Sequence, residues 1–280
     1  MIKKIAVVAS ILLLTGIVGS VFTFKSIYEA EDVTEEKVLH DDFNDIEVTT
    51  DNTKVEFLPS SDSEARVELS GKDSNYHLLA DVEESTLKVD VVYKQRKLYN
   101  FDFTLGQSAL KIYVPEKKYD SLQTSSDNGQ IRVGDLQAKN IHLTTDNGRI
   151  QLNNIQSDEI TTEADNGAID LKAVAAADVK MKADNGKITL DDVEGKLSGK
   201  TNNGSISLIT SYLDRPIDFE TNNGKITIQT EAEPTNVIFD VKVNNGKIDI
   251  FGKKNWDTVV GDGEHLIKLT AENGMITVAK

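Results

Sequence analysis

Residues 141–152 read Ile-His-Leu-Thr-Thr-Asp-Asn-Gly-Arg-Ile-Gln-Leu, and this stretch decides the fold. Apolar and polar residues alternate before the Asn-Gly pair and again after it, which is the pattern of a β-strand with one buried face. Asn and Gly both tolerate the backbone conformations of a tight turn. The stretch therefore predicts two short strands that meet at an Asn-Gly corner.

The same pattern recurs through the second half of the chain. Asn-Gly pairs follow one another at intervals of 19, 19, 19, 18, 20, 22 and 28 residues, and such periodicity is typical of repeat architectures. We expect each Asn to occupy a left-handed corner and to hydrogen-bond the Asn of the next repeat. The pairs predicted to form this structural turn ladder are Asn128 and Gly129, Asn147 and Gly148, Asn166 and Gly167, Asn185 and Gly186, Asn203 and Gly204, Asn223 and Gly224, Asn245 and Gly246, and Asn273 and Gly274.

Two architectures fit this repeat. A row of hairpins would form a meander, whereas one coil per repeat would form a β-solenoid with equivalent residues stacked about 4.8 Å apart. The residue two before each Asn is mostly small, for example Thr145 and Ala164, as a tight interior corner requires. We therefore favour an all-β fold, a right-handed parallel β-solenoid of ~19-residue Asn-Gly repeats, with the hand taken from the rule for parallel crossover connections.

The N-terminus has a different composition. Residues 5–24 carry no charge, and a helix of that length spans about 30 Å, the thickness of a bilayer core. Lys3 and Lys4 precede it, which places the remainder of the chain outside the cytoplasm. A cleaved signal peptide is the alternative. We predict one N-terminal transmembrane helix, and a single-pass cell-membrane protein whose C-terminal domain is extracytoplasmic on a Gram-positive-like cell surface.

These features divide the chain into three parts. Residues 1–24 form the anchor or uncleaved signal, 25–42 a polar stalk, and 43–280 the β-repeat domain. Residues 58–115 break the repeat but contain strand-like pieces, so we expect a hairpin insertion that caps the first coils. Residues 251–265 are expected to play a similar part at the far end, because open solenoid ends expose unpaired strands.

Composition excludes several classes of function. The chain has 46 acidic and 31 basic residues and a formal net charge of -15, so it lacks the basic face that nucleic-acid binding needs. It has no cysteine, which excludes disulfides and thiolate metal sites. The domain must therefore be stabilised by its own core.

A column of carboxylates precedes the first four Asn residues of the ladder. In a solenoid these side chains would lie about 5 Å apart and repel one another. They are weak candidates for a Ca²⁺ site, because Ca²⁺ takes 6–8 oxygen ligands. The alternative is that each carboxylate caps its own turn. The column consists of Asp127, Asp146, Asp165 and Asp184.

Residues 93–103 are the one basic, aromatic-rich stretch. They would either contact a partner, such as wall glycan, protein or membrane, or turn their aromatic side chains into the cap. The four histidines are scattered, and no catalytic, phosphate-binding or dinucleotide motif is present. We therefore expect no enzyme and no catalytic or cofactor-binding residues.

The period, the T-x-(D/N)-N-G-x-I-x-L core and the N-terminal anchor resemble a bacterial putative-adhesin β-strand-repeat family, including LiaG-type membrane-anchored envelope proteins. The resemblance implies a non-catalytic surface binding, adhesin-like or scaffolding module. Its partner would be a cell-wall polymer or a surface or membrane protein. The alternative is an accessory or sensor protein in cell-envelope stress signalling, and a β-helix glycan-active enzyme is a third possibility by fold analogy alone.

Overall fold

The computed structural model describes residues 33–61, 63–71, 75–93, 108–252 and 257–280. These ranges form thirteen β-strands and no helix, so they contain no helical segment that could cross a membrane. The anchor expected at 1–24 lies outside the described residues.

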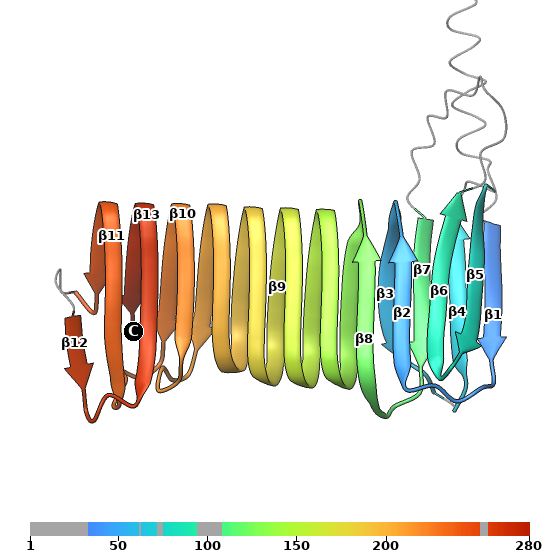
Figure 1. Ribbon diagram of the computed structural model, residues 1–280, viewed down its shortest axis with the longest axis horizontal. Helices are drawn as coiled ribbons and strands as arrows, with labels where there is room; N and C mark the ends of the chain where they lie inside the picture. The colour runs from blue at the N-terminus through green and yellow to red at the C-terminus, as the bar shows by residue number, and fades with distance from the viewer. Residues whose placement is uncertain (1–32, 62, 72–74, 94–107, 253–256) are drawn as a thin grey trace, which may run out of the picture.

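The strands form one mixed sheet wound into coils that stack along the long axis of the molecule (Figure 1). One of them, β9, continues through several coils without a break. The strands are β1 (Val33–Leu39), β2 (Asp45–Thr50), β3 (Thr53–Pro59), β4 (Ala65–Gly71), β5 (Tyr76–Glu83), β6 (Thr86–Tyr93), β7 (Ser108–Val114), β8 (Lys118–Ser126), β9 (Gln130–Thr210), β10 (Ile217–Thr230), β11 (Val237–Ile250), β12 (Asp257–Val260) and β13 (His265–Ala279).

Successive repeats pair in parallel and in register. β9 pairs with β10 so that Asn203 lies opposite Asn223, and β8 pairs with β9 so that Leu122 lies opposite Ile141. The Asn-Gly pair of β10 lies inside a strand that continues on both sides, not at the tip of an antiparallel hairpin. The fold is therefore all-β and β-solenoid-like, and this pairing differs from that of a hairpin meander.

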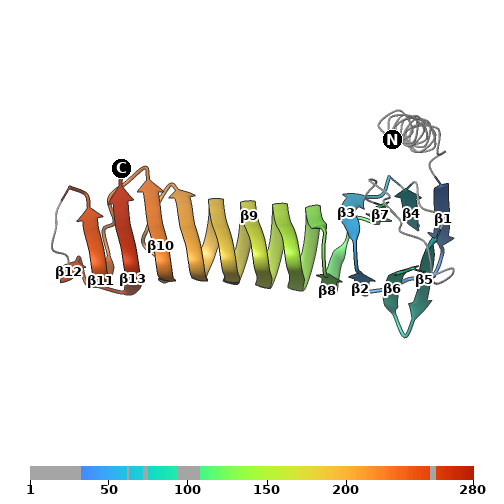
Figure 2. The ribbon, with the colours of Figure 1, turned by 90° about the horizontal axis from the view of Figure 1, so that it is seen from above.

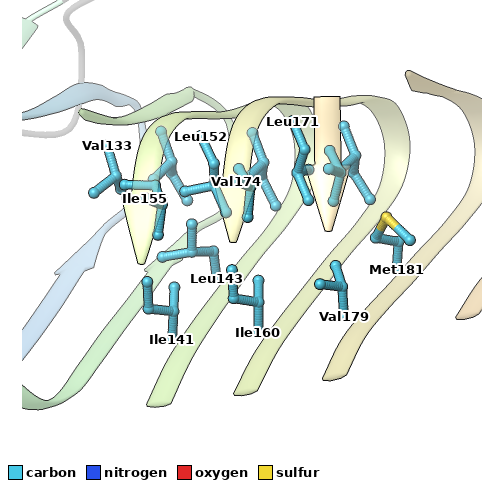
Figure 3. Close-up of a cluster of buried hydrophobic side chains, with 14 of the residues drawn as sticks. Val133, Ile141, Leu143, Leu152, Ile155, Ile160, Leu171, Val174, Val179 and Met181 are labelled. Carbon is cyan, nitrogen blue, oxygen red and sulfur yellow. The ribbon is translucent and has the colours of Figure 1, made fainter. Parts of the chain in front are cut away.

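The interior of the coils is a continuous apolar core (Figure 3). Ile150, Leu152 and Ile155 of one coil are almost completely buried, and Leu171 and Val174 occupy the equivalent positions one coil further on. Burial of one such side chain stabilises the fold by about 1.5–3 kcal/mol. Because the same positions recur in each coil, the core grows by one similar layer per repeat.

At the N-terminal end the order of the coils differs from their order in the chain. β2 pairs in parallel with β6 on one side and β8 on the other, and β3 pairs in parallel with β7 and β9. The first coil along the chain, β2 with β3, therefore lies between two coils that follow it.

The expected hairpin insertion at 58–115 is only partly hairpin. β5 and β6 are antiparallel around Glu84 and Ser85, whose φ angles of 49° and 67° agree with a type I′ turn. β6 and β7, however, add a further parallel coil to the stack. The sequence pattern obscured this because residues 94–107 separate the two strands where other repeats have an Asn-Gly corner.

The segment expected as a stalk, 25–42, is folded over part of its length. β1 pairs in antiparallel fashion with β4, and β4 pairs in the same manner with β7. β1 carries Glu35, Glu36 and Lys37, and such charged residues suit an outer strand because they discourage further pairing. The polar composition thus marks an edge strand at 33–39.

The C-terminal end has the same kind of rearrangement. β13 pairs in parallel with β10 and β11, so the last strand of the chain lies between two earlier ones (Figures 1 and 2). β12 pairs in antiparallel fashion with the first residues of β11. Residues 251–265, expected to cap this end, contribute β12 to the outer edge and also lead the chain back to the gap that β13 fills.

Candidate functional site

One edge of the stack is a row of asparagine side chains. In each except the first, Asn52, Nδ2 donates a hydrogen bond to Oδ1 of the Asn one coil nearer the N-terminal end, at 2.9 to 3.1 Å. All eight bonds run in the same direction, so the amide dipoles add along the row and polarise one another. In spatial order the row is Asn52, Asn128, Asn147, Asn166, Asn185, Asn203, Asn223, Asn273 and Asn245.

The expectation that each Asn occupies a left-handed corner is wrong, because no Asn of this row has a positive φ. The glycine that follows is needed for space. A Cβ on Gly148 would lie 1.7 Å from the carbonyl oxygen of Gly129, and a Cβ on Gly167 would lie 1.8 Å from that of Gly148. Close stacking of backbones therefore excludes side chains at this corner.

The predicted carboxylate column lies beside the asparagine row. Asp127, Asp146 and Asp165 are exposed, and Asp184 is half-buried. Further along, the column continues in amides: Asn202 Nδ2 donates to Asp184 Oδ1 at 3.2 Å. Within the described ranges, no three carboxylate or histidine side chains form a group able to hold a metal ion. The four carboxylates follow the edge of the coils without converging.

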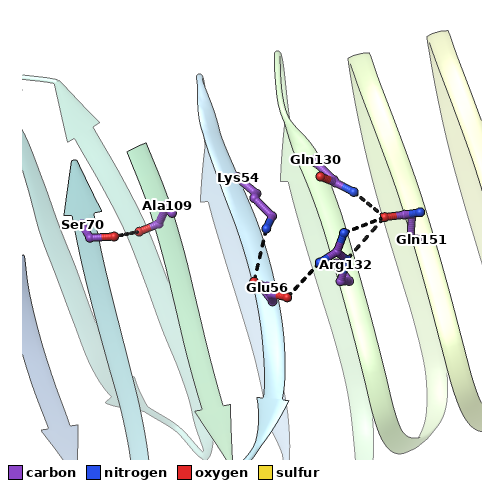
Figure 4. Close-up of polar contacts among 7 residues, drawn as sticks. All are labelled: Lys54, Glu56, Ser70, Ala109, Gln130, Arg132 and Gln151. Carbon is purple, nitrogen blue, oxygen red and sulfur yellow. Dashed lines mark hydrogen bonds and ion pairs between the residues drawn. The ribbon is translucent and has the colours of Figure 1, made fainter. Parts of the chain in front are cut away.

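A network of polar side chains covers the adjacent outer face near the first coils (Figure 4). Arg132 lies 3.1 Å from Glu56 and donates to Gln151 Oε1 at 3.2 Å, while Lys54 lies 3.3 Å from Glu56. Partial burial acts to raise the pKa of Glu56, but the hydrogen bonds from Arg132 and Lys54 outweigh it and lower the pKa. The network joins three successive coils.

Ion pairs between neighbouring coils also occur on the opposite face, along the strand segments that precede the Asn-Gly corner. Lys180 lies 2.6 Å from Glu159, and Lys200 lies 2.9 Å from Glu220. Such exposed pairs contribute about 0–1 kcal/mol each. Their main consequence is electrostatic: cations along the coils lie beside acidic side chains, so the surface offers alternating charge and hydrogen-bonding groups.

Sequence reasoning missed a second corner of the coil. It has a true left-handed backbone, with φ of 52° at Asp135 and 54° at Asn154, a conformation for which Asp and Asn are enriched. Asn154 Nδ2 donates to Asp135 Oδ1 at 2.5 Å. The signal was present, because a buried apolar residue follows this corner in successive coils: Leu136, Ile155, Val174 and Val193.

Other predicted positions do not join a site. Most of the basic aromatic stretch at 93–103 lies outside the described residues, and its first member, Tyr93, packs edge-on against Tyr76 with ring centroids 5.0 Å apart. His40 directly follows β1, whereas His77 lies in β5. Nδ1 of each histidine is within 3.1 Å of a glutamate carboxylate oxygen.

The comparisons with known proteins agree with this geometry. The chain is similar in structure to a "putative adhesin" from Bacteroides fragilis NCTC 9343, with 14% identity, a TM-score of 0.52, and coverage of 89% of this chain and 97% of the other. It is also similar to a "putative lipid binding protein" from Parabacteroides distasonis ATCC 8503, with 13% identity, a TM-score of 0.51, and coverage of 88% and 97%. At these identities the likeness concerns the fold. No curated protein matches the chain.

Family membership follows from a match over most of the sequence. The model described as Toastrack DUF4097 covers residues 43–279, which include every strand from β2 to β13. The match thus spans the repeated Asn-Gly coils and the strands that flank them, and the chain belongs to the Toastrack DUF4097 family.

Proposed function

We propose that this protein is a non-catalytic surface binding module, adhesin-like or scaffolding in character. The observation that carries the proposal is the unbroken asparagine row from Asn52 to Asn245, which links successive coils from that of β2 and β3 to that of β11. A rigid stack presents an extended polar surface at little cost in ordering on binding. The names of the two similar structures, an adhesin and a lipid-binding protein, also refer to binding.

The titratable groups favour binding over catalysis. A carboxylic acid that acts as a general acid near neutral pH needs a raised pKa. The described carboxylates with shifted pKa values, Asp42, Glu56 and Asp214, are all shifted downward. Each of the three is hydrogen-bonded to a cationic side chain or to backbone N–H groups, which is how structural carboxylates behave.

The proposal includes an arrangement at the cell surface. Residues 1–24 would anchor the chain in the cell membrane as a single transmembrane helix, with the coils wound in the right-handed sense and placed outside the cytoplasm. This is the layout of LiaG-type proteins. The positive residues before the apolar segment and the net charge of -15 support it, since an acidic domain is repelled by anionic lipid headgroups. The partner would be a wall polymer or a surface or membrane protein.

The test uses the full-length chain reconstituted in lipid vesicles, with a variant that lacks residues 1–24 as its matched control. We expect the full-length chain to float with the vesicles, to expose its coils to added protease, and to retain isolated Gram-positive wall fragments on the vesicles. The control should remain in the soluble fraction. Flotation without capture of wall fragments or surface proteins would contradict the binding role and favour a signalling partner within the membrane.

A further inference from the structure

A pocket of ≈ 510 Å³ opens on the surface beside the first coils, within the size range of small-molecule sites, roughly 300–1,000 Å³. Its wall comes from four successive layers of the stack: the end of β7, the end of β3, residues 134–137, and the second corner of the next coil. Four layers spaced by about 4.8 Å span about 14 Å. The pocket is therefore elongated along the stack, and an extended chain would suit it.

The wall combines apolar and amide groups. Pro59 and Pro115 provide apolar surface, whereas the side chains of Val114 and Leu136 are almost completely buried behind the wall. The side chains of Gln137 and Gln156 are exposed to solvent at the pocket. A side-chain amide can donate and accept at the same time. Hydroxyl groups have the same dual character, so these glutamines match a ligand rich in hydroxyls.

The positive charges at the pocket are already neutralised. Lys117 lies 2.5 Å from Asp42, and Lys118 donates to both carboxylate oxygens of Asp158, at 3.0 and 3.2 Å. The remaining charged residues of the wall, Glu116 and Asp135, are acidic. The pocket therefore offers no unpaired positive charge to attract an anionic ligand. A neutral ligand would be neither attracted nor repelled by the net charge of the wall.

The pocket is held in shape before any ligand binds. The buried Tyr119 donates its hydroxyl to the carbonyl oxygen of Pro115 at 2.7 Å and stacks on Phe43 with centroids 5.8 Å apart. Burial, reinforced by the charge of Asp42, raises the pKa of Tyr119, so this hydroxyl remains a donor. Lys117 Nζ lies over both rings, 5.2 Å from Phe43 and 5.4 Å from Tyr119. Such preorganisation lowers the ordering cost of binding.

We propose that this pocket binds a neutral, hydroxyl-rich chain, such as a short segment of a glycan. The glutamine amides would bond its hydroxyls, and the rings of Pro59 and Pro115 would cover its C–H faces. The inference rests on the proposed surface-binding function and names its ligand class.

The experiment measures binding of three probes to the full-length chain in detergent by titration calorimetry. The probes are the neutral tetramers of N-acetylglucosamine and of β-linked glucose, and the acidic tetramer of galacturonate. The pocket variant is Gln137→Ala with Gln156→Ala. The control is Gln123→Ala with Gln229→Ala, two exposed glutamines on other parts of the stack.

At least one neutral tetramer should bind, and the pocket variant should weaken its binding about tenfold, since two hydrogen bonds are lost. The control should bind like the wild type, and both variants should unfold at the wild-type temperature. Binding of the acidic tetramer alone, no binding of either neutral tetramer up to about 10 mM, or equal loss in both variants would overturn the inference. If wall fragments bind the pocket variant as well as the wild type, the proposed function stands and this inference fails.

Discussion

Replacing Gly167 by alanine tests whether close stacking of backbones, not backbone conformation, requires glycine at the Asn-Gly corner. The new Cβ would lie 1.8 Å from the carbonyl oxygen of Gly148, whereas real Cβ contacts stay above 3.0 Å. The two coils must therefore move apart locally by about 1.2 Å. A shift of that size takes hydrogen bonds of about 2.9 Å beyond useful length.

The size of the effect follows from what that movement breaks. Two or three ladder hydrogen bonds beside the corner would be weakened, at about 0.5–1.5 kcal/mol each, and overpacking of a tight interior costs about 1–3 kcal/mol. We expect Gly167→Ala to lower the free energy of unfolding by about 3–5 kcal/mol. Gly134→Ala is the matched control, because its Cβ would meet only the carbonyl oxygen of Asn153, at 3.9 Å.

The assay is urea unfolding of the full-length chain, followed by far-ultraviolet circular dichroism. The control should change the free energy of unfolding by less than about 1 kcal/mol, since the alanine fits and restricts the unfolded chain slightly. A loss below about 1 kcal/mol for Gly167→Ala would refute the steric explanation. Equal losses for both variants would show that glycine is needed for another reason.

Three further predictions concern the row, the C-terminal strand and one carboxylate. Asn166→Ala removes two bonds of the asparagine row and should lower the free energy of unfolding by about 1–2 kcal/mol in the same urea assay; no change would mean that the row contributes nothing. A chain that ends at Gly263 lacks β13 and exposes two strand edges, so it should associate with rising concentration, measured by size-exclusion chromatography with light scattering. Burial acts to raise the pKa of Asp214, but hydrogen bonds, led by that from the backbone N–H of Asn236, lower it. The ionised Asp214 carboxylate therefore stabilises the fold above about pH 3.9, and this stabilisation is lost as pH falls toward the lower pKa of the folded state. Asp214→Ala should reduce the fall in the free energy of unfolding between neutral and acid pH.

The stacking of repeats could be predicted because its causes are local. Ile150 and Leu152 alternate with polar residues, so their strand must bury one face. Thr145 and Ala164 are small where the interior narrows, and both are buried. Family and β-solenoid-like architecture therefore follow from residues within one repeat.

The order of the coils could not be predicted, because it depends on pairing between distant segments. The residues near β13 do not indicate that it pairs with both β10 and β11. The two strands have the same alternation of apolar and polar residues, so the local sequence cannot identify the partner. The pocket escaped prediction for the same reason. Pro59, Tyr119 and Gln156 are far apart in the chain, and only the stacking of four layers brings them together.

The order of the coils changes how the ends of the stack are held. In a simple repeat array each terminal unit touches one neighbour, so the ends open first. Here the last strand along the chain has neighbours on both sides: Leu269 lies opposite Phe219 of β10 and opposite Val241 of β11. Releasing β13 therefore requires two ladders to break instead of one. The outermost coils are internal segments, with β12 and the antiparallel strands β4 and β5 along their outer edges. The proposed surface-binding role would benefit from this arrangement, because the last strand of the chain is paired on both sides and cannot separate without breaking both ladders.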